Sequence, residues 1–149
     1  MNKFLLLIVS IFILSACSYE PILLKKNYDF EFNKIEFSGD KIVNEIIKNR
    51  ISRVSSGSKK YNIYYNSKIE KSVVSSNEKG DPTIFNLNID LEYEITDEDK
   101  VIIKNKISKQ STYNDIKDKF ELSNYEINSI KSLAKKIGDE IMMSLISKN

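Results

Sequence analysis

FNLNIDLEYEI, the stretch from Phe85 to Ile95, alternates apolar and polar side chains without a break. A period of two places the apolar residues on one face of a β-strand and the polar residues on the other. The polar positions hold amides and carboxylates. This stretch therefore predicts a strand with one face in a core and the other against water or a polar partner.

A further strand is predicted directly after it, across an acidic turn at residues 97–100. Its apolar residues are Val101, Ile103 and Ile107. Side-chain parity in such a hairpin places Glu94 opposite Lys104 and Glu92 opposite Lys106. Opposite charges would then face each other across the ladder, which favours this register.

Two more strands are predicted upstream. The first covers residues 29–38, with apolar side chains at Phe30, Phe32, Ile35 and Phe37. The second covers residues 61–75, with Ile63, Tyr65 and Ile69 on one side and Tyr64 on the other. Residues 76–82 carry turn-forming asparagine, glycine, aspartate and proline, and predict a turn or exposed loop between this strand and the next.

Two helices are predicted from apolar residues spaced by three and four. The first begins after Asp40 as N-cap, and its apolar residues are Ile42, Val43, Ile46, Ile47, Ile51 and Val54. The second covers residues 122–146, with Ser123 as N-cap and Glu126 completing a capping box. Its apolar residues are Ile127, Ile130, Leu133, Ala134, Ile137, Ile141 and Leu145. Gly138 weakens this helix by up to about 1 kcal/mol, and so indicates a close contact.

The element order is β-α-β-β-β-α, and it predicts an α+β fold. Both helices must hide an apolar face, and a sheet with one polar face offers a single side for them. We expect a two-layer sandwich with two helices packed on a four-stranded, mostly antiparallel sheet. Residues 28–149 form this single domain.

Cys17 follows Leu14-Ser15-Ala16, the pattern of a bacterial lipobox. Residues 1–16 have a positive start and an apolar middle, and predict a lipoprotein signal peptide that is removed. The apolar segment is too short to cross a bilayer as a helix. Cys17 would become the new N-terminus with S-diacylglyceryl and N-acyl lipid, and residues 17–27 would be the tether. An ordinary secretory signal with a chance cysteine is the alternative.

Composition argues against several function classes. The chain has no histidine, no tryptophan and one cysteine. It therefore lacks most of the side chains that are used for zinc, haem and thiol chemistry. We expect no metal site, no cofactor and no enzymatic activity. A formal net charge of +2 leaves no footprint for nucleic acid. Ser18 after Cys17 replaces the aspartate that retains lipoproteins at the inner membrane, which favours outer-membrane delivery on the periplasmic side.

Local sequence resembles the LPS-assembly lipoprotein LptE family, particularly its alphaproteobacterial forms. The resemblance begins at Cys17-Ser18-Tyr19-Glu20-Pro21-Ile22 and continues through the strand at 86–95 and the acidic turn. It is strongest at Ser111-Thr112-Tyr113-Asn114, followed by Phe120 and the terminal helix. Ser18 stands where relatives have glycine, and the terminal helix is richer in lysine and isoleucine.

The resemblance implies a domain that plugs the lumen of the outer-membrane β-barrel LptD and contacts lipopolysaccharide. Two other classes stay open: an envelope lipoprotein that carries a lipid or scaffolds a complex, and a lipid-anchored hydrolase. A lipid carrier would need an apolar cavity, whereas strict alternation predicts a filled core. A hydrolase would need a paired acid and base in a cleft, and Asp90 with Glu92 lacks one.

Basic side chains are the candidates for binding lipopolysaccharide phosphates or a partner. The first set is Lys104, Lys106 and Lys109, and the second is Arg50, Arg53, Lys59 and Lys60. A solvated face or cross-strand pairing explains both sets without a ligand. Residues 97–99 lack the spacing of a calcium loop and fit a turn better. An aromatic surface at Tyr61, Tyr64 and Tyr65 is a further candidate, which strand packing explains equally well.

Overall fold

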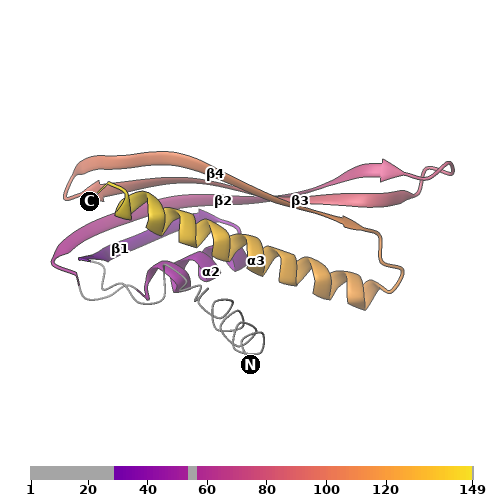
Figure 1. Ribbon diagram of the computed structural model, residues 1–149, viewed down its shortest axis with the longest axis horizontal. Coiled ribbons are helices and arrows are strands. Elements are labelled where there is room, and N and C mark those ends of the chain that lie inside the picture. The colour runs from indigo at the N-terminus through magenta and orange to yellow at the C-terminus, as the bar shows by residue number, and fades with distance from the viewer. Residues whose placement is uncertain (1–28, 54–56, 149) are drawn as a thin grey trace, which may run out of the picture.

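The computed structural model describes residues 29–53 and 57–148. Figure 1 shows the elements in the order β1 (Phe30–Gly39), α2 (Lys41–Ile51), β2 (Lys59–Ser76), β3 (Pro82–Asp97), β4 (Lys100–Asn114) and α3 (Lys119–Ile146). The predicted order and α+β class are confirmed. Val54 of the predicted first helix lies outside the described residues, and α2 ends at Ile51 with Ser52 as C-cap.

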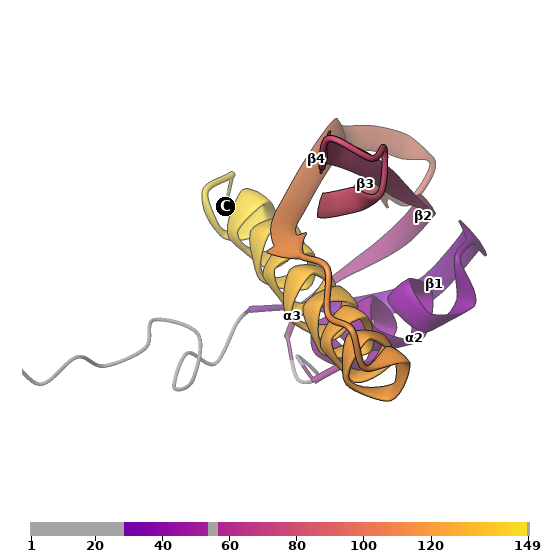
Figure 2. The same cartoon turned by 90° about the vertical axis from the view of Figure 1, so that its right-hand side faces the viewer.

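The four strands form one sheet in the order β1-β2-β3-β4. β1 pairs with β2 in parallel, and the β2–β3 and β3–β4 pairs are antiparallel. A parallel pair needs a crossover, and α2 supplies it. Figure 2 shows both helices on the same side of the twisted sheet. The opposite face of the sheet carries no helix in the described part of the chain.

The predicted alternation of β3 sets the core. Leu87, Ile89, Leu91, Tyr93 and Ile95 are all buried, while the residues between them are exposed or half-buried. The helices fill the space beneath them with fully buried side chains, among them Val43, Ile47, Ile51, Ile137, Ile141 and Leu145. Buried side chains from the sheet and from both helices form one hydrophobic core cluster.

A glycine closes the junction between β1 and α2. Gly39 has φ = 93°, and a Cβ there would lie 1.9 Å from the backbone oxygen of Ser67 on β2. A larger residue would meet both a strained backbone and a clash. Asp40 follows as the predicted N-cap, since its carboxylate accepts from the Val43 N–H at 3.0 Å. The chain therefore turns from strand to helix directly against β2.

A buried amide then holds α2 on the sheet. Asn44 is 1% exposed, and its side chain donates to the Ser38 carbonyl at 2.9 Å and accepts from the Ser67 hydroxyl at 2.7 Å. The Tyr65 hydroxyl donates to the Asn44 carbonyl at 2.9 Å, and burial raises the pKa of this phenol. Every buried polar group here has a partner, so the network costs little and fixes the helix position.

The start of α3 corrects the predicted boundary. The helix begins at Lys119 rather than near residue 122, and its N-cap is Asp118 rather than Ser123. The Asp118 carboxylate accepts from the N–H groups of Phe120 and Glu121 at 2.8 and 3.1 Å. The first turn was missed because it is polar or exposed, with Phe120 75% exposed. The spacing of apolar residues cannot reveal a helical turn whose side chains are not buried against the rest of the protein.

β4 extends past Ile107, the last apolar residue used to predict it, and is less regular than strict alternation. It continues beyond Ile107 to Asn114 because the far half of β3 supplies backbone partners as far as Ile84. A register shift between Ile95 and Thr96 leaves Val101 46% exposed, although alternation predicted it in the core. Backbone pairing therefore extends a strand whose own side chains are largely polar.

Burial stops halfway along β2. Tyr61, Ile63, Tyr65 and Ser67 are buried, and no residue of β2 after Ser67 is. The rest of the strand runs on with β3 into the hairpin at the right of Figure 1, with Val73 and Val74 more than half exposed. Of the two predicted forms for 76–82, a turn or an exposed loop, the structure has a short turn, in which the Asn77 side chain accepts from the Lys79 and Asp81 N–H groups.

Candidate functional site

The helix-free face of the sheet is the principal candidate surface. Its outward side chains come from β2, β3 and β4 and are almost all polar: Asn66, Lys68, Glu70, Asn86, Asn88, Asp90, Glu92, Glu94, Lys104, Lys106, Ser108 and Gln110. Neighbours on this face bond to one another, as in the 3.0 Å contact from the Ser108 hydroxyl to the Asn88 oxygen. We call these residues the polar sheet face.

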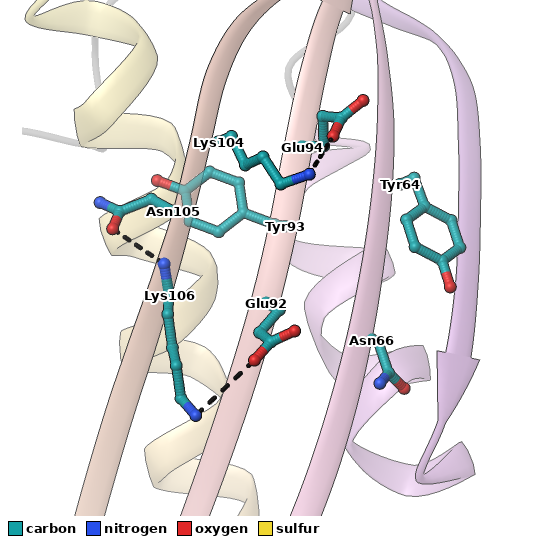
Figure 3. Close-up of a pocket in the computed structure, with 8 residues that line it drawn as sticks. All are labelled: Tyr64, Asn66, Glu92, Tyr93, Glu94, Lys104, Asn105 and Lys106. Atoms are coloured by element: carbon teal, nitrogen blue, oxygen red, sulfur yellow. Dashed lines mark hydrogen bonds and ion pairs between the residues drawn. The ribbon is translucent and has the colours of Figure 1, made fainter.

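A shallow groove of about 360 Å³ lies on the polar sheet face (Figure 3). Its polar wall residues are Asn66, Glu92, Glu94, Lys104, Asn105 and Lys106, and Tyr64 closes one side. Tyr93 also lies at the groove, but its ring is buried on the other face and its hydroxyl donates to Ser144 of α3 at 3.0 Å. The groove is an open surface that suits a polar partner.

The predicted charge pairs across β3 and β4 are confirmed. Glu94 faces Lys104 and Glu92 faces Lys106 in the register, with nitrogen-to-oxygen distances of 3.1 and 3.7 Å. The Lys104 side chain is 77% exposed, so solvent screens the pair strongly. Both lysines therefore already have carboxylate partners, and a phosphate would compete with these for them.

Lys109 does not share a surface with Lys104 and Lys106. It lies on the helix side of β4, where its ammonium pairs with Glu140 of α3. The odd and even positions of a strand point to opposite faces, so three lysines at 104, 106 and 109 cannot form one patch. Treating them as a single set was wrong for this geometric reason.

The second basic set is divided as well. Arg50 and Arg53 line a groove between α2 and α3 together with Ile46, Asn49 and Lys135. The Arg50 guanidinium pairs with Asp139. Lys60 lies at the start of β2, where it pairs with Glu31 at 3.6 Å, and Lys59 opens the same strand. The helix-layer groove thus contains the more concentrated positive charge.

The tyrosines do not form an aromatic surface. Tyr61 and Tyr65 are buried in the core, at 5% and 0% exposure, and Tyr64 alone of the three is exposed. Strand alternation separates residue 64 from its neighbours at 61 and 65. The interpretation as strand packing is therefore the correct one.

The acidic run at 97–99 is a hairpin turn. Asp97 pairs with Lys100, and Glu98 takes a positive φ of 51° at the tip. Among the described residues, no group of three or more acidic, cysteine or histidine side chains is placed to hold a metal ion.

A cluster of charged and aromatic residues was missed by sequence reasoning. The Lys71 ammonium lies 2.5 Å from the Glu126 carboxylate and 4.5 Å from the centre of the Phe85 ring. The Tyr113 hydroxyl donates to the same carboxylate at 2.5 Å, and the Tyr113 ring lies 5.3 Å from that of Tyr125. We call Lys71, Phe85, Tyr113, Tyr125 and Glu126 the distal cluster.

The distal cluster shifts the ionisation of its members. Burial acts to raise the pKa of Glu126, but the hydrogen bonds from Lys71 and Tyr113, with the positive charges of Lys71 and Lys119, outweigh it and lower that pKa. The hydrogen bond to Glu126 raises the pKa of Lys71, and burial followed by the same carboxylate raises that of Tyr113. Glu126 had been assigned to a capping box, which hid its real partners. The cluster ties the first turns of α3 to the far half of the sheet.

Cys17, the predicted lipidation site, and the tether lie outside the described residues. Neither α2 nor α3 combines the length and the apolar character that a membrane-crossing helix needs.

Fold and surface together define a class: a two-layer α+β domain with both helices on one side of a four-stranded sheet. Three solved structures of bacterial lipoproteins share this fold. Rare lipoprotein B from Shewanella oneidensis aligns at a TM-score of 0.60 and 17% identity, covering 77% of this chain and 95% of that one. No family model and no curated protein matches the sequence.

The other two structures agree on the fold. Uncharacterized lipoprotein B from Nitrosomonas europaea has a TM-score of 0.56 at 13% identity and covers 82% of this chain and 88% of its own. A minor lipoprotein from Acinetobacter baumannii has a TM-score of 0.51 at 10% identity, with 72% and 86% covered. Identities this low show a shared fold, and the site residues must be argued from this chain alone.

Proposed function

We propose that this protein is a non-enzymatic outer-membrane lipoprotein, anchored through lipid on Cys17, that partners and plugs an LptD-like β-barrel for lipopolysaccharide assembly. The polar sheet face carries the proposal. Rare lipoprotein B, whose fold this chain shares, is of the LptE family. The sequence resemblance is to the alphaproteobacterial type of that family.

A barrel lumen is a polar environment, and the polar sheet face complements it. Large outer-membrane barrels have lipid-facing apolar residues and a polar interior. Lysines and carboxylates of opposite sign alternate across β3 and β4, as at Glu92–Lys106 and Glu94–Lys104. Such a face forms hydrogen bonds with a polar wall in any of several places, and it exposes little apolar surface before it docks.

The length of the strands suits the same role. An 18-residue strand such as β2 extends for about 60 Å, at roughly 3.3 Å per residue. The apolar band of an outer-membrane barrel is only about 25 Å tall. The β2–β3 hairpin is therefore long enough to run the height of a lumen.

The test is recovery of partners from the native outer membrane. The lipidated protein with a C-terminal tag is purified in detergent, and the co-purifying chains are identified by mass. We expect a large β-barrel in stoichiometric amount. Recovery of the protein alone, or with inner-membrane chains, would overturn the proposal and favour an envelope binding module of another kind.

Variants locate the contact. Charge reversal at Lys104 and Lys106, to glutamate, places like charges opposite Glu94 and Glu92 on the polar sheet face. We expect it to reduce barrel recovery about tenfold or more, since the two cations that would meet acceptors of the barrel become carboxylates, and mismatched charges across an interface cost several kcal/mol. The matched control reverses Lys131 and Lys136, exposed lysines of α3. Equal loss in both variants would show that the polar sheet face is not the contact.

A further inference from the structure

The helix layer contains a second groove, on the side of α2 and α3 that does not pack on the sheet. The groove has a volume of about 320 Å³ and is lined by Ile46, Asn49, Arg50, Arg53 and Lys135. The two helices lie side by side here (Figure 1). Their core residues point to the sheet, whereas Arg53 and Lys135 are exposed. Three cations thus border one small depression.

The position of Arg50 is built into the packing of the two helices. A Cβ on Gly138 of α3 would lie 2.9 Å from Cγ of Arg50 and 3.0 Å from its Cβ. The glycine therefore makes room for the aliphatic stem of the arginine, at a cost in helix propensity. This is the close contact that Gly138 predicted.

Asp139 then orients the guanidinium. The Nε of Arg50 donates to the Asp139 carboxylate, and both side chains are about one-third exposed. A guanidinium also carries N–H groups on its two terminal nitrogens, and these stay available to an anion. Arg50 is therefore a fixed donor rather than a freely moving charge.

The other two cations lack such a partner. Within residues 29–53 and 57–148, no carboxylate forms an ion pair with Arg53 or Lys135. Basic residues near the end of α2 offset the helix dipole, which explains Arg50 and Arg53 in part. The dipole of α2 does not explain Lys135, which lies in the middle of α3. The groove therefore has more positive charge than the ion pairs and the helix dipole of the domain account for.

The groove lies at the end of the domain where the chain arrives from its predicted anchor. Gly57, soon after α2, packs directly on Phe30, since a Cβ there would lie 1.9 Å from the Phe30 nitrogen. Ser58 donates its N–H to the Asp29 carboxylate at 3.1 Å beside it. Phe30 is thirteen positions after Cys17, and a chain of that length spans at most about 45 Å. The basic groove is therefore within reach of the membrane that would hold the lipid.

We infer that Arg50, Arg53 and Lys135 bind the phosphate of an anionic phospholipid headgroup, of the phosphatidylglycerol kind, in the leaflet that holds the anchor. The inference rests on the lipid anchor of the proposed function. Basic residues near an anionic surface each strengthen attachment about fivefold, and a lipid anchor is commonly reinforced by such a patch. The helix layer then faces the membrane, and the polar sheet face stays free for a partner.

The experiment measures how fast an amine-acylating reagent labels each lysine of the mature, lipidated protein on vesicles. Vesicles of phosphatidylcholine alone are compared with an equimolar mixture with phosphatidylglycerol. We expect labelling of Lys135 to slow about fivefold in the mixture, while Lys104 and Lys106 on the other face change less than twofold. Equal labelling of Lys135 on both vesicles would overturn the inference.

Variants and competitors separate the alternatives. Arg53→Gln, an exposed change beyond the end of α2, should remove most of the protection of Lys135, and Arg53→Lys should restore it. Protection by millimolar inorganic phosphate on phosphatidylcholine vesicles would identify free phosphate as the ligand and overturn the lipid headgroup. Protection by lipopolysaccharide but not by phosphatidylglycerol would overturn it as well.

Failure of the anchor is distinguishable from failure of the groove. The mass of the N-terminal peptide reports whether Cys17 carries lipid, independently of any labelling rate. No barrel is present in the assay, so loss of the barrel partner would not alter it. A lipidated protein without protection at Lys135 would overturn the groove alone.

Discussion

The two halves of the β2–β3 hairpin are both paired as strands, but they differ in how far β2 is buried. In the near half, Ile63, Tyr65 and Ile95 are buried beneath α2 and the end of α3. In the far half, β2 has no buried residue, and Val73 is 52% exposed. On β3, Leu87 and Ile89 of this half still belong to the core, and the distal cluster links the half to the first turns of α3. The comparison teaches that the fold is stabilised at one end of a long sheet, while the other end extends from it.

The largest difference in stability is expected when one apolar residue is replaced in each half of β2. Ile63→Ala should lower the free energy of unfolding by about 2–5 kcal/mol, because it leaves a cavity under the helices. Val73→Ala should lower it by no more than about 0.5 kcal/mol, since that side chain is already half in water. Denaturant unfolding of both variants checks this, and similar losses would contradict an end-weighted core.

A second test concerns the buried amide at the near end. Asn44→Ala should cost about 1–3 kcal/mol, since it leaves the Ser38 carbonyl and the Ser67 hydroxyl without their buried partner. Asn88→Ala on the polar sheet face also removes hydrogen bonds, but water can replace them there, and about 0.5 kcal/mol is expected. Thermal unfolding of the pair measures the difference, and a larger loss for Asn88 would reverse the conclusion.

The third test uses pH on the distal cluster. The pKa of Glu126 is lowered in the folded protein from an ordinary 4.5. Its ionised form therefore stabilises the fold above pH 4.5, and that contribution disappears as the pH falls through the lowered pKa. Glu126→Gln should cost about 1 kcal/mol or less near neutral pH, given partial exposure of the Lys71 pair.

The difference in the free energy of unfolding between Glu126→Gln and the wild-type protein should become smaller in acid. Denaturant unfolding at a series of pH values from about 6 to 3 measures it. Hydrogen exchange adds a local reading, because the far half of the hairpin should exchange faster in the variant while β1 is unaffected. A gap that stays constant in acid would show that Glu126 acts through packing and not through charge.

The smallest effect is expected on the polar sheet face itself. A double-mutant cycle of Glu94→Gln and Lys104→Gln should give a coupling below about 1 kcal/mol, because the lysine is strongly exposed. A much larger coupling would mean that the face stabilises the domain. The small value would fit a surface whose residues serve a partner and not the fold.

Much of the fold could be predicted because its signals are local. Strict alternation predicted the core face of β3, and charge complementarity predicted the Glu94–Lys104 pairing. The N-cap at Asp40 was visible because an acid precedes an apolar period. The start of α3 was not visible, because Asp118 caps a first turn that has no buried face.

The candidate site was harder to predict because its residues meet only after folding. Lys109 and Lys106 are three apart in sequence and on opposite faces in the sheet. The pairing of Arg50 with Asp139 joins two helices 89 residues apart, and Lys71 meets Glu126 across 55 residues. Sequence spacing does not predict contacts between residues so far apart in the chain. Strand parity alone could have separated Lys109 from the other two lysines.

With the N-terminal tether that we propose, the parallel pairing of β1 with β2 has a mechanical consequence. Any force between the membrane and the domain enters through Asp29 and is carried first by β1, an edge strand with one neighbour. Load directed along the strand is shared by the backbone bonds that pair β1 with β2 on both sides of the register shift between Phe32 and Lys34. Load directed across the sheet breaks the same bonds one after another. The attachment is therefore strong in one direction and weak in the other, and the orientation of the domain on its membrane decides which applies.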